Sequence, residues 1–470
     1  MLSLCLIKLI STDTKKFNLM NHSINPQLNL FNNIKTFRTI HYLGSKLRLV
    51  EFIQEVIDEV DPSMGGVCDL FAGSGSVTQH LSNNRKIIAV DVQEYSEIIC
   101  NALLNPISDD FILSFSNRVK ESKVLEELSF NFKEIISLEE ELLDESVNVD
   151  PERICDFLEN SSIYSAEISL PVNSHRDLKN VLQVSTDKLK KMNSRCLAFR
   201  YFGGVYFSFK QSIEIDAILE SITKADSKYK YILSAALLST ASDIVNTVGK
   251  QFAQPLRPRD KSGRPKKSLL KQFRKDRKLD VFDIFSNWVI RYSSRQITTK
   301  GHKFFKQDCF DVIDLLDSDI KTVYADPPYT RDHYSRFYHG LETLCLKDFP
   351  EISTTTIKGT TSLSRGLYRK DRHQSEFCIR SKAPTAFRRL FQKVSSTDKS
   401  LIVSYSPYSK EKGAHPRVVE LEYLEKLASE YFNLVEIRSP GNFSHSKLNK
   451  TDLHLDSEKD SEILLVCKNA

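Results

Sequence analysis

The chain has 470 residues, of which 40% are hydrophobic and 27% are charged, and its 66 basic residues nearly balance its 61 acidic residues. A chain of this length usually forms more than one structural unit, and this composition is typical of a soluble globular protein. We expect no membrane span, because the apolar runs are far shorter than the roughly 20 residues that a membrane helix needs, and the net charge of +5 is too small to identify a partner.

The first residues and the cysteines carry little functional signal. We expect residues 1–34 to form an N-terminal extension, since their apolar start lacks the basic stretch and the cleavage pattern of a secretory signal. The nine cysteines are scattered singly, without a Cys-x-x-Cys pair or a Cys/His cluster at zinc spacing. We therefore predict no metal site, no disulfide framework and a cytoplasmic location, where thiols stay reduced.

A glycine-rich turn follows the first predicted strand. The apolar segment from Gly66 runs into Asp69-Leu-Phe-Ala-Gly-Ser-Gly75, and glycines at the carboxyl end of a parallel strand let a ligand approach the backbone. The dinucleotide fingerprint requires a third glycine where this chain has Thr78, and the Gly-Lys-Ser/Thr of a phosphate-binding loop is absent. The turn therefore predicts a ligand without phosphates.

The next predicted strand ends in an acid. It runs from Lys86 to Asp91, which lies eighteen residues after Gly73. Nucleotide-binding folds place a carboxylate on the ribose hydroxyls at about this distance from the turn. The two strands and the helix between them form a predicted βαβ unit with Asp91 as its ribose ligand.

The middle of the chain is mostly helical by pattern, as in 213–222 and 228–244. The segment 257–278 carries eleven Lys or Arg against two Asp, and it predicts an exposed basic loop that leads into a basic helix. Its Gly-Arg-Pro-Lys-Lys core resembles a minor-groove AT-hook. It supplies three predicted nucleic-acid contacts, Arg264, Lys266 and Lys267. A solvated linker is the alternative for this segment. The aromatic, glycine-containing run 200–208 predicts a DNA-facing turn.

The tetrapeptide Asp326-Pro-Pro-Tyr329 follows another predicted strand, and strands are also predicted at 400–405 and 462–467. Two consecutive prolines remove two N–H donors, so this turn can only accept hydrogen bonds. Such a turn suits an amino group, with one proton accepted by the Asp326 carboxylate and one by the Pro327 carbonyl. The Tyr329 ring is predicted to stack on the base that carries such an amino group. Taken alone, the tetrapeptide could also be a surface turn.

The basic and aromatic residues after the tetrapeptide allow two interpretations. Arg331 and Arg336 are predicted to contact nucleic acid, and an ordinary amphipathic helix is the alternative. The set Arg365, Tyr368, Arg369 and Arg372 is a second basic and aromatic patch that could contact a strand backbone.

Three segments together resemble the hallmark motifs of the D12 class of adenine-specific DNA methyltransferases, the DNA adenine methylase family. They are His41-Tyr-Leu-Gly-Ser-Lys46, the glycine-rich turn and Asp326-Pro-Pro-Tyr329, in the order of that family. The resemblance implies S-adenosylmethionine as cofactor and N6 of adenine as the methyl acceptor. It implies these residues near the cofactor: Tyr42, Lys46, Asp69, Phe71, Gly73, Gly75, Asp91, Asp308 and Asp326. Among them, Lys46 would lie near the methionine carboxylate and Asp308 near the adenine.

The resemblance also implies an α/β fold, a Rossmann-like class I methyltransferase sheet split by an inserted, mostly helical target recognition domain. We predict a catalytic domain from 35–105 and 301–470, with the recognition domain at 106–300. The expected function is site-specific DNA methylation in restriction-modification or host protection, on double-stranded DNA. A cognate restriction endonuclease is a further expected partner, and the expected oligomeric state is a monomer or weak dimer. RNA adenine N6 or DNA cytosine N4 methylation, and a non-catalytic DNA-binding regulator, are the alternatives.

Overall fold

A seven-stranded, mainly parallel sheet organises the part of the chain that carries the motifs. The computed structural model describes residues 36–192, 196–330, 334–357, 359–406, 417–440 and 462–469. The strand order is β3-β2-β1-β4-β7-β9-β8. The first five strands pair in parallel, and β9 pairs antiparallel with both β7 and β8. The strands are β1 (Gly66–Asp69), β2 (Ile87–Asp91), β3 (Lys303–Lys306), β4 (Ile320–Ala325), β7 (Ser400–Tyr405), β8 (Leu434–Arg438) and β9 (Ile463–Lys468). The predicted α/β class is confirmed.

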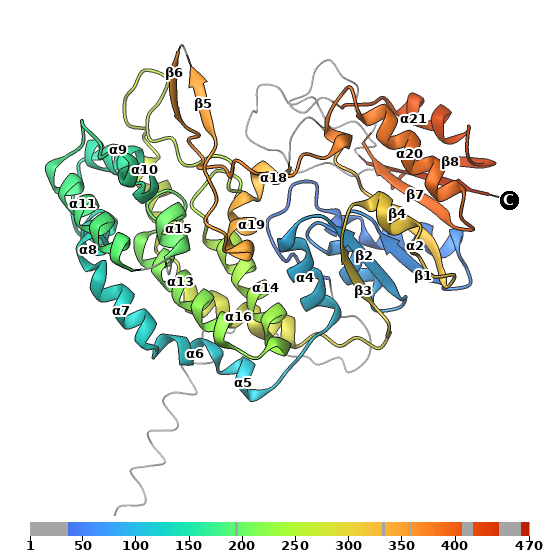
Figure 1. Cartoon of the computed structure of the whole chain (residues 1–470), viewed down its shortest axis with the longest axis horizontal. Helices are drawn as coiled ribbons and strands as arrows, with labels where there is room; N and C mark the ends of the chain where they lie inside the picture. The colour runs from blue at the N-terminus through green and yellow to red at the C-terminus, as the bar shows by residue number, and fades with distance from the viewer. Residues whose placement is uncertain are drawn as a thin grey trace, which may run out of the picture. The chain divides into compact units, whose positions relative to one another are not determined.

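Helices cover both faces of this sheet, because alternate strand residues are apolar on both sides. On one face, Val67, Ala89 and Ile402 pack with α2 (Val50–Val60), α3 (Ser76–Leu81) and α4 (Glu94–Leu104). On the other face, Cys68, Val90 and Val403 pack with α17 (Cys309–Ile313), α20 (Ala383–Ser395) and α21 (Leu421–Ala428). The result is a three-layer arrangement, visible in Figure 1.

The parallel order brings four aspartates to one edge of the sheet. Asp69 ends β1, Asp91 ends β2, Asp308 follows β3 and Asp326 follows β4. These four strands are neighbours in register, so their carboxyl ends meet at the same edge. Open α/β sheets bind ligands at this edge, and residues far apart in the sequence are thereby collected there.

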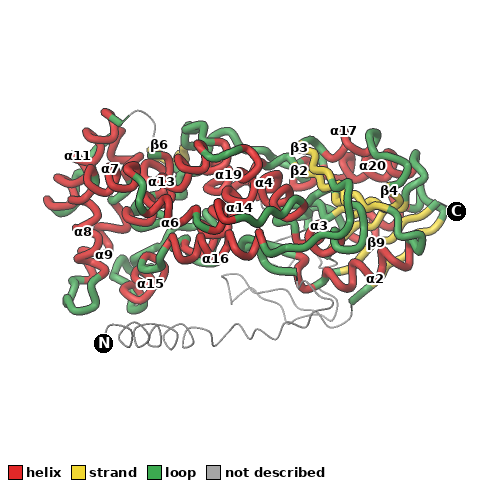
Figure 2. Tube along the Cα trace, turned by 90° about the horizontal axis from the view of Figure 1, so that it is seen from below, coloured by secondary structure: helices red, strands yellow, loops and turns green. Residues whose placement is uncertain are grey.

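Between α4 and β3 the chain is helical. The helices are α5 (Asp110–Leu113), α6 (Phe115–Lys120), α7 (Lys123–Asn131), α8 (Lys133–Leu143), α9 (Pro151–Asn160), α10 (Ile163–Ile168), α11 (Arg176–Lys191), α12 (Leu197–Phe202), α13 (Phe209–Lys224), α14 (Ser227–Ile244), α15 (Leu269–Arg277) and α16 (Val281–Ser293). Helices α13 and α14 confirm the two predicted helices. Helices α7, α8, α9 and α11 lie farthest from the sheet in both views, whereas α14 packs on α4 (Figures 1 and 2).

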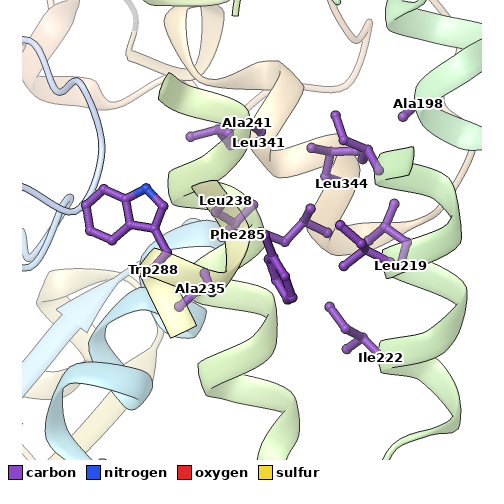
Figure 3. Packing of buried hydrophobic residues seen from close by; sticks show 14 of the residues in the cluster. Ala198, Leu219, Ile222, Ala235, Leu238, Ala241, Phe285, Trp288, Leu341 and Leu344 are labelled. Carbon is purple, nitrogen blue, oxygen red and sulfur yellow. The ribbon is translucent and has the colours of Figure 1, made fainter. Parts of the chain in front are cut away.

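The core of this helical region also takes in a later segment. Phe285 of α16 packs among apolar residues of α13 and α14, together with Leu341 and Leu344 of α19 (His339–Leu346) (Figure 3). The remaining elements are η1 (Lys46–Arg48), which precedes α2, then α18 (Tyr334–Phe337), the hairpin β5 (Thr354–Ile357) and β6 (Thr360–Leu363), and η2 (Glu376–Cys378), which precedes α20. The chain therefore returns to the helical region after the tetrapeptide.

One prediction about a surface segment is wrong, and a second is wrong for one residue, Arg369. In the run 200–208, Tyr201, Phe202 and Tyr206 are at most 2% exposed, so these aromatics form core rather than a DNA-facing turn. Arg369 of the second patch is buried, and it forms a double ion pair with Asp348 at 2.7 and 2.6 Å. Within the described residues, no helix is long and apolar enough to cross a membrane. The predicted N-terminal extension and Arg331 lie outside the described residues.

Candidate active site

The glycine-rich turn is shaped by a tyrosine that covers it. Gly73 and Gly75 have φ values of +51° and +73°, a region that L side chains rarely adopt. A Cβ atom at Gly73 would lie 2.7 Å from the hydroxyl of Tyr42. The Tyr42 ring is itself stacked on Tyr338 with centroids 4.7 Å apart. The predicted residues Tyr42 and Gly73 are thus brought together, and glycine is required there because Tyr42 lies so close.

Asp91 is held by backbone N–H groups. Its Oδ2 accepts a hydrogen bond from the N–H of Gly73 at 2.9 Å, and its Oδ1 accepts one from Gln93 at 2.9 Å. Burial nevertheless raises the pKa of Asp91 above its usual value. The carboxylate is therefore fixed in orientation directly beside the glycine-rich turn.

A cavity opens at the carboxyl edge of the sheet, and five predicted residues line it. These are Tyr42, Phe71, Asp91, Asp308 and Asp326. Residues that had not been predicted complete the wall, among them Tyr95, Phe310, Glu376, Phe377 and Cys378. The described lining contains four carboxylates and no lysine or arginine. Such a cavity favours a cationic or neutral ligand over a phosphorylated one.

Phenylalanine rings form one wall of the cavity. Phe377 contacts Phe71 edge-on, with centroids 5.4 Å apart, and stacks with Phe310 at 5.9 Å. Asp308 begins the adjoining helix α17 by accepting a hydrogen bond from the N–H of Phe310 at 3.0 Å. Aromatic walls with one carboxylate at the side suit a flat ring that carries an amino group.

Asp69 lies beneath the turn rather than in the cavity lining. It is 1% exposed, and its Oδ2 accepts a hydrogen bond from the Thr78 hydroxyl at 2.8 Å. Burial raises the pKa of Asp69 to about 7. Thr78, which stands where the dinucleotide fingerprint has glycine, therefore has a structural partner of its own.

Lys46 is paired with two carboxylates behind the tetrapeptide. Its Nζ lies 2.8 Å from Oδ2 of Asp326 and 3.2 Å from Oε1 of Glu462, and its side chain is 5% exposed. Burial acts to lower the pKa of Lys46, but attraction by Asp326 and Glu462 outweighs it and raises the pKa well above its usual value. The ammonium therefore stays charged and holds the Asp326 carboxylate by one oxygen.

Glu462 also holds the tyrosine of the tetrapeptide. Its Oε2 accepts a hydrogen bond from the Tyr329 hydroxyl at 3.2 Å, and its Oε1 accepts one from Ser404 at 2.8 Å. The guanidinium of Arg417 lies 4.8 Å from the centre of the Tyr329 ring. Sequence reasoning missed Glu462, although an acid directly before a buried apolar strand was an available signal.

The predicted nucleic-acid contacts that the structure describes lie on two segments, 264–267 and α18. Arg264 pairs with Asp260 at 3.5 Å on an exposed turn, and Lys266 donates to the carbonyl of Arg257 at 2.6 Å. Lys267 is exposed on the same segment. Arg336 is exposed on α18, after the tetrapeptide.

This geometry agrees with the comparison of the sequence with known proteins. Residues 42–184 and 266–405 match the model of the D12 class N6 adenine-specific DNA methyltransferase family. These segments make up more than half of the chain, and they include Tyr42, the glycine-rich turn, Asp91 and the tetrapeptide. The chain belongs to this family.

Three characterised methylases are similar to the chain. The modification methylase LlaI of Lactococcus lactis is 23% identical over 91% of this chain and 55% of its own length. The type II methyltransferase M.FokI of Planomicrobium okeanokoites is 24% identical over 78% of this chain and 44% of its own length. The type II methyltransferase M.NlaIII of Neisseria lactamica is 25% identical over 75% of this chain and 80% of its own length. The chain thus spans about half the length of the first two relatives.

Proposed function

We propose that the chain is a site-specific DNA methyltransferase that transfers a methyl group from S-adenosylmethionine to N6 of an adenine flipped out of the duplex. The observation that carries this proposal is the position of Asp326, which borders the same cavity as Asp91 and Asp308. Family membership and the printed names of the three relatives support it. These names, a modification methylase and two type II methyltransferases, also support a role in restriction-modification.

The cavity fits the proposed cofactor by its charge. Its four carboxylates suit a ligand with a positive sulfur and an ammonium group and with no phosphate. In this proposal the fixed Asp91 carboxylate accepts from the ribose hydroxyls, Asp308 accepts from the adenine amino group, and Phe310 and Phe377 cover the adenine ring. When bound, S-adenosylmethionine supplies a methyl group that is already activated by the positive charge on sulfur.

Asp326 and Pro327 prepare the target amino group. The lone pair on N6 of adenine is delocalised into the ring, which makes it a weak nucleophile. The Asp326 carboxylate and the Pro327 carbonyl accept hydrogen bonds from its two N–H groups and so localise the lone pair for attack. As N6 bonds to the methyl carbon, the bond from that carbon to sulfur breaks and N6 gives up one proton. Lys46 and Glu462 hold the carboxylate and the Tyr329 ring in place, and such fixed positioning is a large part of catalysis. Stacking of the adenine on Tyr329 would contribute about 1 to 3 kcal/mol, which offsets part of the few kcal/mol that flipping the adenine costs.

We propose that the helices of 106–300 recognise the target sequence in double-stranded DNA. Their place between α4 and β3 supports this, since they adjoin the cavity through α14 and α4. The proposal includes a cytoplasmic protein, a monomer or weak dimer, that works alongside a cognate restriction endonuclease.

Expression in a host that lacks DNA methylation tests the proposal. We expect sequencing of modified bases to find N6-methyladenine at one short motif in the host DNA. N4-methylcytosine at a motif, or unmodified DNA with methylated RNA, would replace it by one of the alternatives that the same acceptor turn allows. Unmodified DNA and RNA, together with cofactor-independent DNA binding, would favour the non-catalytic regulator.

A further inference from the structure

Two segments far apart in the sequence are locked together beside the cavity. The first is the loop 252–266, and the second consists of 336–357 and 359–372, on the other side of the tetrapeptide. The Tyr368 hydroxyl donates to the carbonyl of Ala253, and Arg365 donates to the carbonyl of Leu256 at 2.7 Å. The Tyr206 hydroxyl bridges them, since its single proton lies between the carbonyl oxygens of Phe252 and Gly366, the latter at 2.9 Å. These hydrogen bonds give the two segments one fixed surface.

Basic side chains gather on this surface around one aromatic ring. The guanidinium carbons of Arg336 and Arg372 lie 5.6 and 5.3 Å from the centre of the Tyr368 ring. The pKa of Arg365 is lowered by burial and by repulsion from Arg257, and that of Lys266 is lowered by burial, Arg257 and Arg365. We call these five cations, Arg257, Lys266, Arg336, Arg365 and Arg372, the basic surface.

Neighbouring arginines on the same segments are already neutralised, but these five are not. Arg259 pairs with Glu152 and Glu159 at 2.9 and 3.0 Å, and Arg369 pairs with Asp348. Among the described residues, no carboxylate forms an ion pair with a member of the basic surface. The Nη1 atom of Arg372 is buried and has no hydrogen-bond partner within the same residues. Glu159 attracts Arg365 and Asp260 attracts Lys266 at longer range, but in both cases burial and the neighbouring arginines outweigh them. Like charges held close together without ion-pair partners favour an anionic partner.

The basic surface lies at the cavity wall. Tyr334 and Ser335, which line the cavity, directly precede Arg336, and His373, which also lines it, directly follows Arg372. An anionic chain that crosses these cations would therefore pass the cavity mouth. Planar guanidinium groups match phosphate geometry, and arginine is favoured for nucleic-acid backbones.

The geometry points to the basic surface as the site that holds the phosphate backbone of DNA next to the flipped adenine. This inference rests on the proposed function and deepens it, because it assigns the strand contacts near the target base to these residues. Arg264, in the AT-hook-like core, is paired with Asp260 and contributes less. The contacts are sequence-independent, so they position the strand while other residues read the bases.

The salt dependence of DNA binding tests this inference. Each phosphate contact contributes about 0.9 to the slope of log K against log salt. The triple variant Arg336→Gln, Arg365→Gln, Arg372→Gln should lower the slope magnitude by about 3, measured by fluorescence anisotropy with a mixed-sequence DNA duplex from about 50 to 200 mM salt. The single variant Arg336→Gln should lower it by about 1, which covers the case in which the triple variant does not fold.

A control with the same change in net charge isolates the surface. The triple variant Lys86→Gln, Arg388→Gln, Arg438→Gln removes three cations that pair with carboxylates elsewhere on the protein, and it should keep the wild-type slope. An unchanged slope in the surface variants would overturn the inference, and so would an equal fall in both triple variants. In either case, methylation of DNA by the wild-type protein would leave the proposed function intact. Wild-type binding and methylation of RNA but not DNA would instead overturn the proposed function.

Discussion

The substitution Glu462→Gln tests how the tetrapeptide is held. Glutamine keeps the shape of the side chain but removes its charge. Its carbonyl can still accept from Ser404, whereas its amide nitrogen cannot accept from Tyr329, and the 3.2 Å contact with Lys46 loses its ionic character. Lys46 keeps Asp326 at 2.8 Å, so the fold should survive.

The magnitude follows from these contacts. Hydrogen bonds to charged groups contribute about 1.5 to 3 kcal/mol. If that energy positions Asp326 and Tyr329 in the transition state, the rate of methyl transfer should fall roughly 10- to 150-fold. The pKa of Lys46 should also fall, because one of the two carboxylates that raise it is gone. The rate should therefore decline at a lower alkaline pH than in the wild type.

Single-turnover transfer of a labelled methyl group to DNA, measured across pH, is the assay. Glu436→Gln on the neighbouring strand β8 is the control, since this glutamate pairs only with Arg438 among the described residues, at 2.8 Å, and it should leave rate and pH profile unchanged. A rate for Glu462→Gln within about twofold of wild type, less than ~0.5 kcal/mol, with an unchanged pH profile, would refute the positioning role.

Two further predictions concern stability. Phe285→Ala removes a fully buried ring from the helical core and should lower the free energy of unfolding by about 3 to 5 kcal/mol, measured by urea denaturation. Ile290→Ala on the same helix, where the side chain is 53% exposed, should change it by less than about 0.5 kcal/mol, and equal effects would contradict the packing. Burial raises the pKa of Glu214 from its ordinary value of 4.5 to about 7, so the folded protein favours the protonated side chain. The contribution of this group to stability is therefore fully present below pH 4.5 and is lost as the pH rises through about 7. Thermal unfolding from about pH 5 to 8 should show a steeper fall in Tm for the wild type than for Glu214→Gln, and parallel curves would contradict this assignment.

The sheet and three of its ligand-edge acids could be predicted from the sequence because their signals are local. Short apolar runs ending in Asp69, Asp91 and Asp326 are visible within a few residues, and parallel pairing then brings their ends to one edge. The helices 213–222 and 228–244 were equally clear from their periodicity.

Contacts across long sequence separations could not be predicted. Lys46 and Glu462 are more than 400 residues apart, so nothing near either residue indicates the other. The stacking of Tyr42 on Tyr338 likewise has no local signal, because the two residues are far apart in the sequence. The run 200–208 misled because glycine, arginine and aromatics are common in surface turns, whereas here tertiary packing buries Tyr206 completely.

The substitution Asp326→Ala tests the central claim most directly. Lys46 keeps Glu462 as a partner, so the variant should fold and should still bind S-adenosylmethionine in equilibrium titration. We predict that methyl transfer to adenine in DNA, measured by mass spectrometry of the nucleosides, becomes undetectable while the cofactor Kd changes little. Near-wild-type formation of N6-methyladenine by this variant would contradict the account.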